Sequence, residues 1–157
     1  MRSNAITRIA CQIAPHVMMR PGELRQALWS EIDMTAAVWT VPPERMKMRR
    51  PHAVPLSRQV IAHLQELHEL TGPEGFVFPA FHTSKRSMSE NTINQAFRRM
   101  GYAVGVVTAH GLRTTASSML NESGKWSPDA IERSLAHADP NSVRGIYNRG
   151  RYWDERV

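Results

Sequence analysis

The sequence lacks the features that several protein classes need. It has one cysteine, Cys11, which cannot form an internal disulfide or a zinc site of thiolates, so nothing indicates an oxidising compartment. No run of about 18 apolar residues could span a bilayer, and no apolar signal-peptide core follows the first residues. These absences favour a soluble protein of the reducing cytoplasm with no membrane partner.

Common catalytic patterns are missing as well. There is no glycine-rich loop followed by a lysine, which nucleotide hydrolysis would need, and no HExxH or paired-carboxylate pattern for a metal. His63 and His68 are five residues apart and would diverge on a helix. Ser117 and Ser118 lie inside an expected helix without the elbow motif of a serine hydrolase. We therefore expect neither a metal site nor these two hydrolase activities.

Positive charge is what the chain has in excess. Its 157 residues suit one domain, and a hydrophobic fraction of 41% is ordinary for a globular protein. Lysine and arginine number 20 against 14 acids, which gives a formal charge of +6. The sequence pI near 10.2 favours a polyanionic partner, and nucleic acid before a membrane.

The expected fold is α+β and mainly α-helical, with a small antiparallel sheet. Apolar spacing, caps and stop signals predict helices over 5–17, from 21 to about 29–31, 57–72, from about 89 to 101, 108–124, 127–137 and 139–150. Short β-branched or extended runs at 37–41 and 52–56 predict a hairpin with a basic tip. A brief extended piece at 76–79 precedes an expected polar loop with Lys85 and Arg86.

The basic residues are clustered. Neither 45–58 nor 91–121 contains an acid, although both contain arginines. Either stretch alone is well explained as a solvated basic surface, but two in so short a chain favour a groove lined for phosphates. Aromatic residues are sparse near them, which argues against base stacking on single strands. The backbone of duplex DNA is the favoured ligand.

His110 and Arg113 are three residues apart at an expected helix start, so both face one side near the positive end of the helix dipole. That geometry favours an anion. The alternative is that His110 caps its helix and Arg113 pairs with an acid, and these two residues alone leave it open. His137 and Tyr147, ten residues apart, would each pass for an ordinary structural residue.

The order of these residues is more specific than any one of them. Arg20-Pro-Gly-Glu23-Leu, Lys47 seven residues before Val54-Pro-Leu, His110-Gly-Leu-Arg113, Leu135-Ala-His137 and Tyr147 resemble the tyrosine recombinase, or phage integrase, family. The resemblance extends from about residue 5 to the end, and the segment 45–50 looks most like prophage and genomic-island integrases.

The resemblance implies a role for each position of this pattern. Tyr147 would be the nucleophile that forms a 3′-phosphotyrosine, and Lys47 on the hairpin would protonate the departing 5′ oxygen. Two arginines and two histidines would stabilise the charge that grows on the phosphate: Arg20, Arg113, His110 and His137. Glu23 would orient Arg20. Because the tyrosyl bond conserves the phosphodiester energy, no cofactor is expected.

The resemblance also implies the partners. Further contacts to duplex DNA are expected from the basic residues Arg45, Arg49, Arg50, Lys85, Arg86, Arg98 and Arg99. Residues 1–157 would be a single catalytic domain, without the N-terminal core-binding domain and the C-terminal tail of the family. Its partners would be attachment sites in double-stranded DNA and other integrase protomers, as tetramers of the full-length enzyme, at the nucleoid of a bacterium.

Two other interpretations of the sequence stay open. The chain could be a non-catalytic DNA-binding remnant of a prophage integrase, in which the pocket only binds phosphate. It could also relax supercoiled DNA without a specific site, as a type IB topoisomerase does, because that chemistry uses the same residues.

Overall fold

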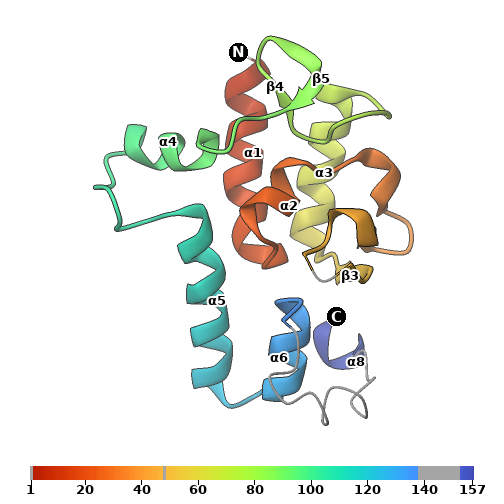
Figure 1. The fold of residues 1–157 in the computed structure, drawn as a ribbon, viewed down its shortest axis with the longest axis vertical. Helices are drawn as coiled ribbons and strands as arrows, with labels where there is room; N and C mark the ends of the chain where they lie inside the picture. Colours follow the sequence, from red (N-terminus) through yellow and green to blue (C-terminus); the bar gives the residue numbers. More distant parts are fainter. Residues whose placement is uncertain (1, 48, 138–152) are drawn as a thin grey trace.

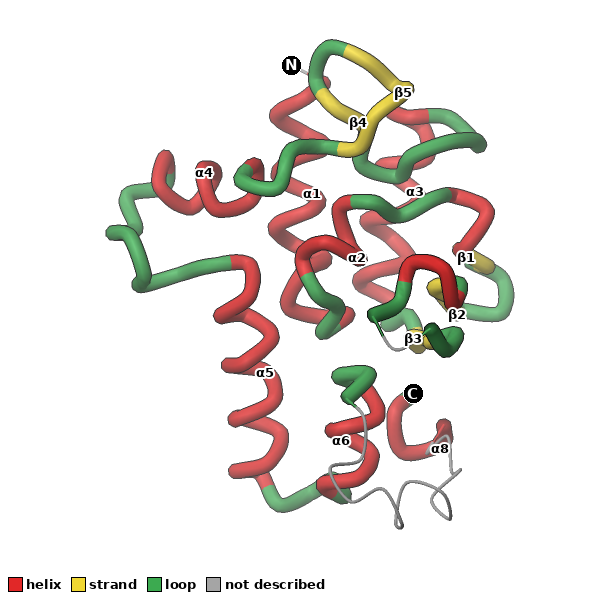
Figure 2. Tube along the Cα trace, in the orientation of Figure 1, coloured by secondary structure: helices red, strands yellow, loops and turns green. Residues whose placement is uncertain are grey.

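The computed structural model describes residues 2–47, 49–137 and 153–157. It is mainly helical with two small antiparallel sheets, which confirms the predicted α+β class. Figure 2 shows the strands at two separate places, with helices between them. Within these ranges no helix is long and apolar enough to cross a membrane.

Two helices form the centre of the core. Helix α1 (Arg2–Val17) buries Ile9 and Ile13 completely and packs against α3 (Arg58–Thr71). Helix α3 begins as predicted, because the Ser57 hydroxyl accepts a hydrogen bond from the backbone N–H of Val60 at 3.3 Å. It ends at Gly72, whose φ of 87° terminates the helix.

The predicted hairpin is confirmed and belongs to a three-stranded antiparallel sheet. Strand β2 (Val38–Val41) pairs with β3 (His52–Pro55) in a register that sets Trp39 opposite Val54. Strand β1 (Ile32–Asp33), which was not predicted, pairs with the other side of β2. The connection between β2 and β3 carries a short 3-10 turn, η2 (Pro43–Arg45).

The second helix is shorter than the sequence predicts. Helix α2 (Pro21–Arg25) ends before a separate 3-10 turn, η1 (Trp29–Glu31). The segment between them pairs with the chain after α3 instead, since the N–H of Val77 donates to the carbonyl of Ala27 at 2.9 Å. A long-range backbone pairing has therefore replaced the last turns of the predicted helix.

The expected polar loop with Lys85 and Arg86 is in fact a strand. Strands β4 (Pro79–Ala80) and β5 (Thr83–Ser87) form a second hairpin. The N–H of Met88 donates to the carbonyl of Phe78 at 2.7 Å and extends the hairpin, and both of these side chains are buried in the core. Helix α4 (Thr92–Arg99) then begins after 89–91, later than predicted.

The last part of the described chain extends away from α1 and α3 (Figure 1). Helix α5 (Ala109–Ser123) begins after Thr108 and ends at Gly124, as predicted. Helix α6 (Pro128–Ser134) returns along it, and α8 (Trp153–Arg156) packs on α6. Helix α6 ends three residues before the predicted position 137. The helix predicted over 139–150 lies outside the described residues.

Candidate active site

Arg20 follows the C-terminal end of α1 and occupies the N-cap position of α2. Its guanidinium donates to Glu23 at 2.8 Å, and its backbone N–H donates to the other oxygen of the same carboxylate at 3.1 Å. The Glu23 side chain is 6% exposed, whereas that of Arg20 is 28% exposed. The contact between Glu23 and Arg20 that the resemblance implies is therefore present, and part of the Arg20 side chain stays open to solvent.

Arg113 lies one helical turn after His110 on α5 and is buried. Its Nη1 donates to the carbonyl of Met18 at 2.7 Å, and its Nη2 donates to the carbonyl of Leu135. Met18 directly follows α1, and Leu135 is the C-cap of α6. The guanidinium thus bridges the C-terminal ends of two helices, where the helix dipoles are negative.

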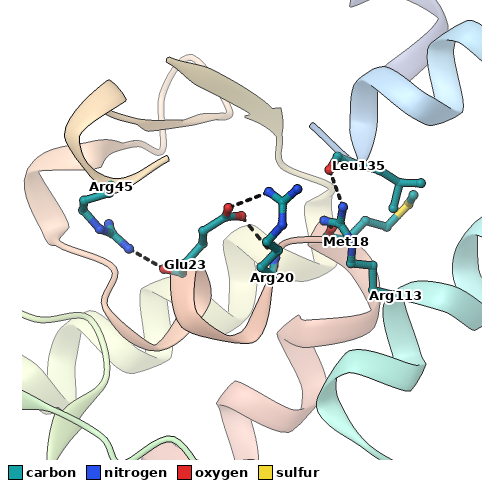
Figure 3. A network of polar contacts seen from close by, with 6 residues as sticks. All are labelled: Met18, Arg20, Glu23, Arg45, Arg113 and Leu135. Atoms are coloured by element: carbon teal, nitrogen blue, oxygen red, sulfur yellow. Dashed lines mark hydrogen bonds and ion pairs between the residues drawn. The ribbon is translucent and has the colours of Figure 1, made fainter. Parts of the chain in front are cut away.

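The two arginines interact electrostatically. Burial, and then the charge of Arg20, lower the pKa of Arg113, while Glu23 and Glu132 oppose the shift. Figure 3 shows the two guanidinium groups side by side, with the Glu23 carboxylate beyond Arg20. Two cations held this close, one buried and one partly exposed, form a place where an anion would be stabilised.

The structure also bears on the alternative left open for His110 and Arg113. Thr108, and not His110, caps α5, because its hydroxyl accepts from the N–H of Gly111 at 2.8 Å. His110 is exposed at the helix start. Within the described ranges Arg113 donates to these two carbonyls and forms no ion pair with an acid, so the second half of the alternative finds no support there.

Gly111 has a steric reason to be glycine. A Cβ at this position would lie 2.9 Å from the Thr108 hydroxyl oxygen, the same atom that accepts the Gly111 N–H. Any side chain would therefore displace the cap. The small residue between His110 and Arg113 allows the first turn of α5 to close.

His137 follows α6 and comes two residues after Leu135, whose carbonyl Arg113 binds. Its Nδ1 forms a 2.7 Å hydrogen bond with a carboxylate oxygen of Glu132, and its side chain is 43% exposed. Sequence reasoning did not identify Glu132, because an acid inside a predicted helix is an ordinary surface residue.

The basic residues of the hairpin tip are either exposed or anchored to the core. Lys47, Arg49 and Arg50 are exposed. Arg45, in contrast, forms an ion pair with Glu31 and donates to the carbonyl of Glu23, with 15% of its side chain exposed. Figure 3 shows Arg45 and Arg20 meeting Glu23 from opposite sides.

No pattern in the sequence indicates the ion pair between Arg45 and Glu31. Buried Glu31 also accepts a 3.1 Å hydrogen bond from the indole of Trp39 on β2. The acid therefore joins the sheet to the base of the basic tip. DNA contact by Arg45 stays a prediction, and its observed contacts are structural.

The other basic residues lie farther away. Lys85 and Arg86 are exposed on β5, which lies beside the N-terminal end of α1, whereas Arg20 follows the opposite end (Figure 1). On α4, Arg99 is exposed, but Arg98 donates to the carbonyl of Tyr102 at 2.8 Å and to the carbonyls of Ala103 and Val107. The structure does not bring these four residues to Arg20 and Arg113.

Sequence reasoning missed His52, which is a buried group beside the site. Burial, and then the charge of Arg156, lower its pKa to about 4, while a hydrogen bond with the backbone of Ser134 opposes the shift. Arg156 of α8 donates to the carbonyl of Ala53 at 2.7 Å. The neutral imidazole thus lies where β3 meets α6 and α8.

The predicted nucleophile cannot be placed, because Tyr147 lies outside the described residues. Among the residues that are described, no group of three or more potential ligands could hold a metal ion.

Comparison with known proteins identifies relatives over nearly the whole chain. Residues 2–152 match the phage integrase family. The chain is 44% identical to "Putative protein IntB" of Escherichia coli (strain K12) over 96% of this chain and 42% of that protein. It is 41% identical to the integrase of Enterobacteria phage P4 over 99% of this chain and 38% of that protein. The chain therefore spans about two fifths of the length of these relatives.

Solved structures agree with the fold. The integrase from mycobacterium phage Brujita superposes with a TM-score of 0.73 at 20% identity, over 97% of this chain and 49% of that one. The XerA recombinase gives a TM-score of 0.67 at 16% identity, over 99% and 62%. At these identities the likeness concerns the fold.

Proposed function

Because the chain belongs to the phage integrase family, we propose that it is the catalytic domain of a prophage-type, site-specific DNA recombinase. It cleaves and rejoins duplex DNA through a covalent 3′-phosphotyrosine at Tyr147. The observation that carries the proposal is the pairing of Arg20 with Arg113, which come from separate elements and lie beside one another.

The arginine pair supplies what phosphoryl transfer needs. Negative charge grows on the non-bridging oxygens in the transition state, and preorganised cationic donors stabilise it without reorganisation. Arg113 is held by two carbonyls and Arg20 by Glu23, so neither guanidinium has to be ordered when the phosphate arrives. A bound phosphate also relieves the repulsion between the two cations.

The histidines and the hairpin lysine complete the proposed site. His110 lies one helical turn before Arg113 on α5, and His137 comes two residues after Leu135, whose carbonyl Arg113 binds. Lys47 lies two residues after Arg45, which is fastened to α2 through the carbonyl of Glu23. Lys47 protonates the departing 5′ oxygen, and the exposed Arg49 and Arg50 beside it bind the DNA backbone.

Tyr147 is assigned by its place in the sequence, ten residues after His137. A free tyrosine with a pKa of about 10 is mostly protonated at neutral pH, so it needs nearby positive charge or a base. The arginine pair supplies the first and a histidine the second. Tyr147 attacks the phosphorus, the bond to the 5′ oxygen breaks, and Lys47 gives that oxygen its proton.

A second part of the proposal concerns the partners and the location of the whole protein. We infer that it acts on attachment sites of double-stranded DNA, together with other integrase protomers as a tetramer, in the bacterial cytoplasm at the nucleoid. No cofactor takes part, because the phosphotyrosine retains the energy needed to rejoin the strand.

A comparison of two arginine–glutamate pairs tests the proposed function. The chain is incubated with a pool of nicked suicide duplexes of randomised core sequence, and covalent adduct and duplex binding are both measured. Arg20→Ala should reduce adduct formation by about a hundredfold to a thousandfold and leave binding nearly unchanged. Arg8→Ala, which breaks the surface pair with Glu66, should change neither.

Each other outcome identifies a rival. Duplex binding without any adduct from the wild-type chain would favour a non-catalytic DNA-binding remnant. Relaxation of supercoiled plasmid with no sequence enriched among the adducts would favour the topoisomerase-like activity. Equal effects of Arg20→Ala and Arg8→Ala would remove Arg20 from the site.

A further inference from the structure

The turn after α6 places His137 directly over Glu132. Ala136 has a φ of 50°, in the left-handed region, and so ends the helix. Its N–H donates to the carbonyl of Arg133, and the N–H of His137 donates to the carbonyl of Glu132, both at 3.1 Å. This pair of bonds is the Schellman arrangement, which folds the chain back over the last turn. His137 therefore meets Glu132 through its backbone as well as its side chain.

The side-chain contact selects one ring nitrogen. Nδ1 of His137 lies 2.7 Å from a carboxylate oxygen of Glu132. An ionised carboxylate only accepts hydrogen bonds, so Nδ1 carries the hydrogen and donates it. The second nitrogen, Nε2, is then the acceptor in the neutral ring. In the imidazolium both nitrogens donate, and the carboxylate compensates the charge.

Glu132 also acts on the arginine pair. Its charge is one of the two acidic contributions that oppose the lowered pKa of Arg113, and the other comes from Glu23. Both acids thus act on Arg113, and each also contacts a second residue of the proposed site. Glu23 on α2 binds Arg20, and Glu132 on α6 binds His137.

We propose that Glu132 is a positioning residue for the recombinase reaction, which fixes His137 as the Nδ1–H tautomer and presents Nε2 to the reacting phosphate. The catalytic half of this inference rests on the proposed function, whereas the tautomer does not. A neutral His137 held in this way can accept one proton at Nε2. The imidazolium that results can donate the same proton to a phosphate oxygen.

A purely structural role makes a different prediction. The side chains of His137 and Glu132 are 43% and 49% exposed, and exposed ion pairs contribute little to folding stability. If the pair were only a surface contact, its removal would change neither the tautomer nor the chemistry measurably.

Two variants separate these roles. Glu132→Gln keeps a side-chain oxygen that accepts the Nδ1 hydrogen, and Glu132→Ala removes the acceptor. Nitrogen-15 chemical shifts of the histidine rings report the tautomer in the intact chain, with the His137 signals assigned through His137→Gln. The matched control is Glu122→Ala, which changes an exposed acid on a different helix, α5.

The wild-type chain, Glu132→Gln and the control should show the Nδ1–H tautomer in the neutral ring, and Glu132→Ala should shift it towards Nε2–H. Adduct formation on nicked duplex should fall about tenfold to a hundredfold in Glu132→Ala and recover to within about threefold in Glu132→Gln.

An unchanged tautomer in Glu132→Ala would overturn the positioning role. A changed tautomer with an unchanged rate of adduct formation would overturn its part in the reaction. If the wild-type chain forms no adduct, the proposed function fails, and the nitrogen-15 result still decides whether Glu132 sets the tautomer.

Discussion

The guanidinium of Arg113 donates a 2.7 Å hydrogen bond to the carbonyl of Met18 and so fastens α5 to the end of α1. The same group binds the carbonyl of Leu135 at the end of α6. A residue that belongs to the proposed phosphate site is thus also a structural link between three helices. Substitution of Arg113 will therefore affect folding and chemistry together.

We expect Arg113→Ala to lower the free energy of unfolding by about 2–4 kcal/mol, because two carbonyls lose a buried, charged donor. Arg113→Lys should lose less, since its ammonium can still reach one of them. Urea unfolding followed by circular dichroism measures both. A loss below about 1 kcal/mol for the alanine variant would show that the two contacts contribute little. Arg20→Ala is the cleaner probe of catalysis, since Arg20 is partly exposed and, among the described residues, its side chain pairs with Glu23 alone.

The first turn of α5 permits a double-mutant test. Gly111→Ala should destabilise the protein although alanine favours helices, because the new Cβ would lie 2.9 Å from the Thr108 hydroxyl. Thr108→Ala should cost about 1 kcal/mol through loss of the cap. In the Thr108→Ala background the obstacle is gone, so Gly111→Ala should then stabilise by up to about 1 kcal/mol. Additive effects in thermal unfolding would contradict this steric explanation.

His52 makes stability depend on pH. Its pKa falls from 6.5 to about 4 on folding, so the unfolded chain binds the proton between these values and the folded chain does not. The contribution of neutral His52 to the free energy of unfolding is therefore fully present above pH 6.5. It decreases as the pH falls towards 4, by about 3 kcal/mol in total.

Urea unfolding between pH 4 and 7 measures this effect. His52→Gln should flatten most of the slope in that window, whereas His82→Gln, at an exposed histidine, should leave it unchanged. An identical slope for the wild-type chain and His52→Gln would rule out His52 as the group responsible.

Ala136 is a site where glycine should stabilise the protein. Its φ of 50° is costly for a residue with a Cβ, and glycine adopts it freely. We expect Ala136→Gly to raise the free energy of unfolding by about 0.5–1 kcal/mol. Ala130→Gly, inside α6, should lower it by about 1 kcal/mol or more. Destabilisation by both variants would mean that the Ala136 methyl group matters more than its backbone strain.

Local patterns predicted the elements that local interactions specify. The apolar face of α1, the Ser57 cap of α3 and the Thr108 cap and Gly124 end of α5 are all visible in a few neighbouring residues. The β2–β3 hairpin was predicted for the same reason.

The failures came from contacts between distant residues. Helix α2 ends early because 27–29 pair with 75–77, and no local signal marks that pairing. The end of α6 was missed because the left-handed position is Ala136 and not a glycine. In the site, the order of residues predicted Arg20, Glu23 and Arg113, but not the buried Glu31 that holds Arg45 or the Glu132 that holds His137.

The most direct measurement is the identity of the amino acid that becomes bound to DNA. Trypsin cuts after Arg144, Arg149 and Arg151, so Tyr147 falls in the peptide 145–149 and Tyr152 in a different one. After reaction with nicked duplex and digestion of protein and DNA, mass spectrometry should find the nucleotide remnant on 145–149. Tyr147→Phe should give no adduct and Tyr152→Phe the wild-type amount. An adduct that survives in Tyr147→Phe, or a remnant on another peptide, would contradict the proposed mechanism.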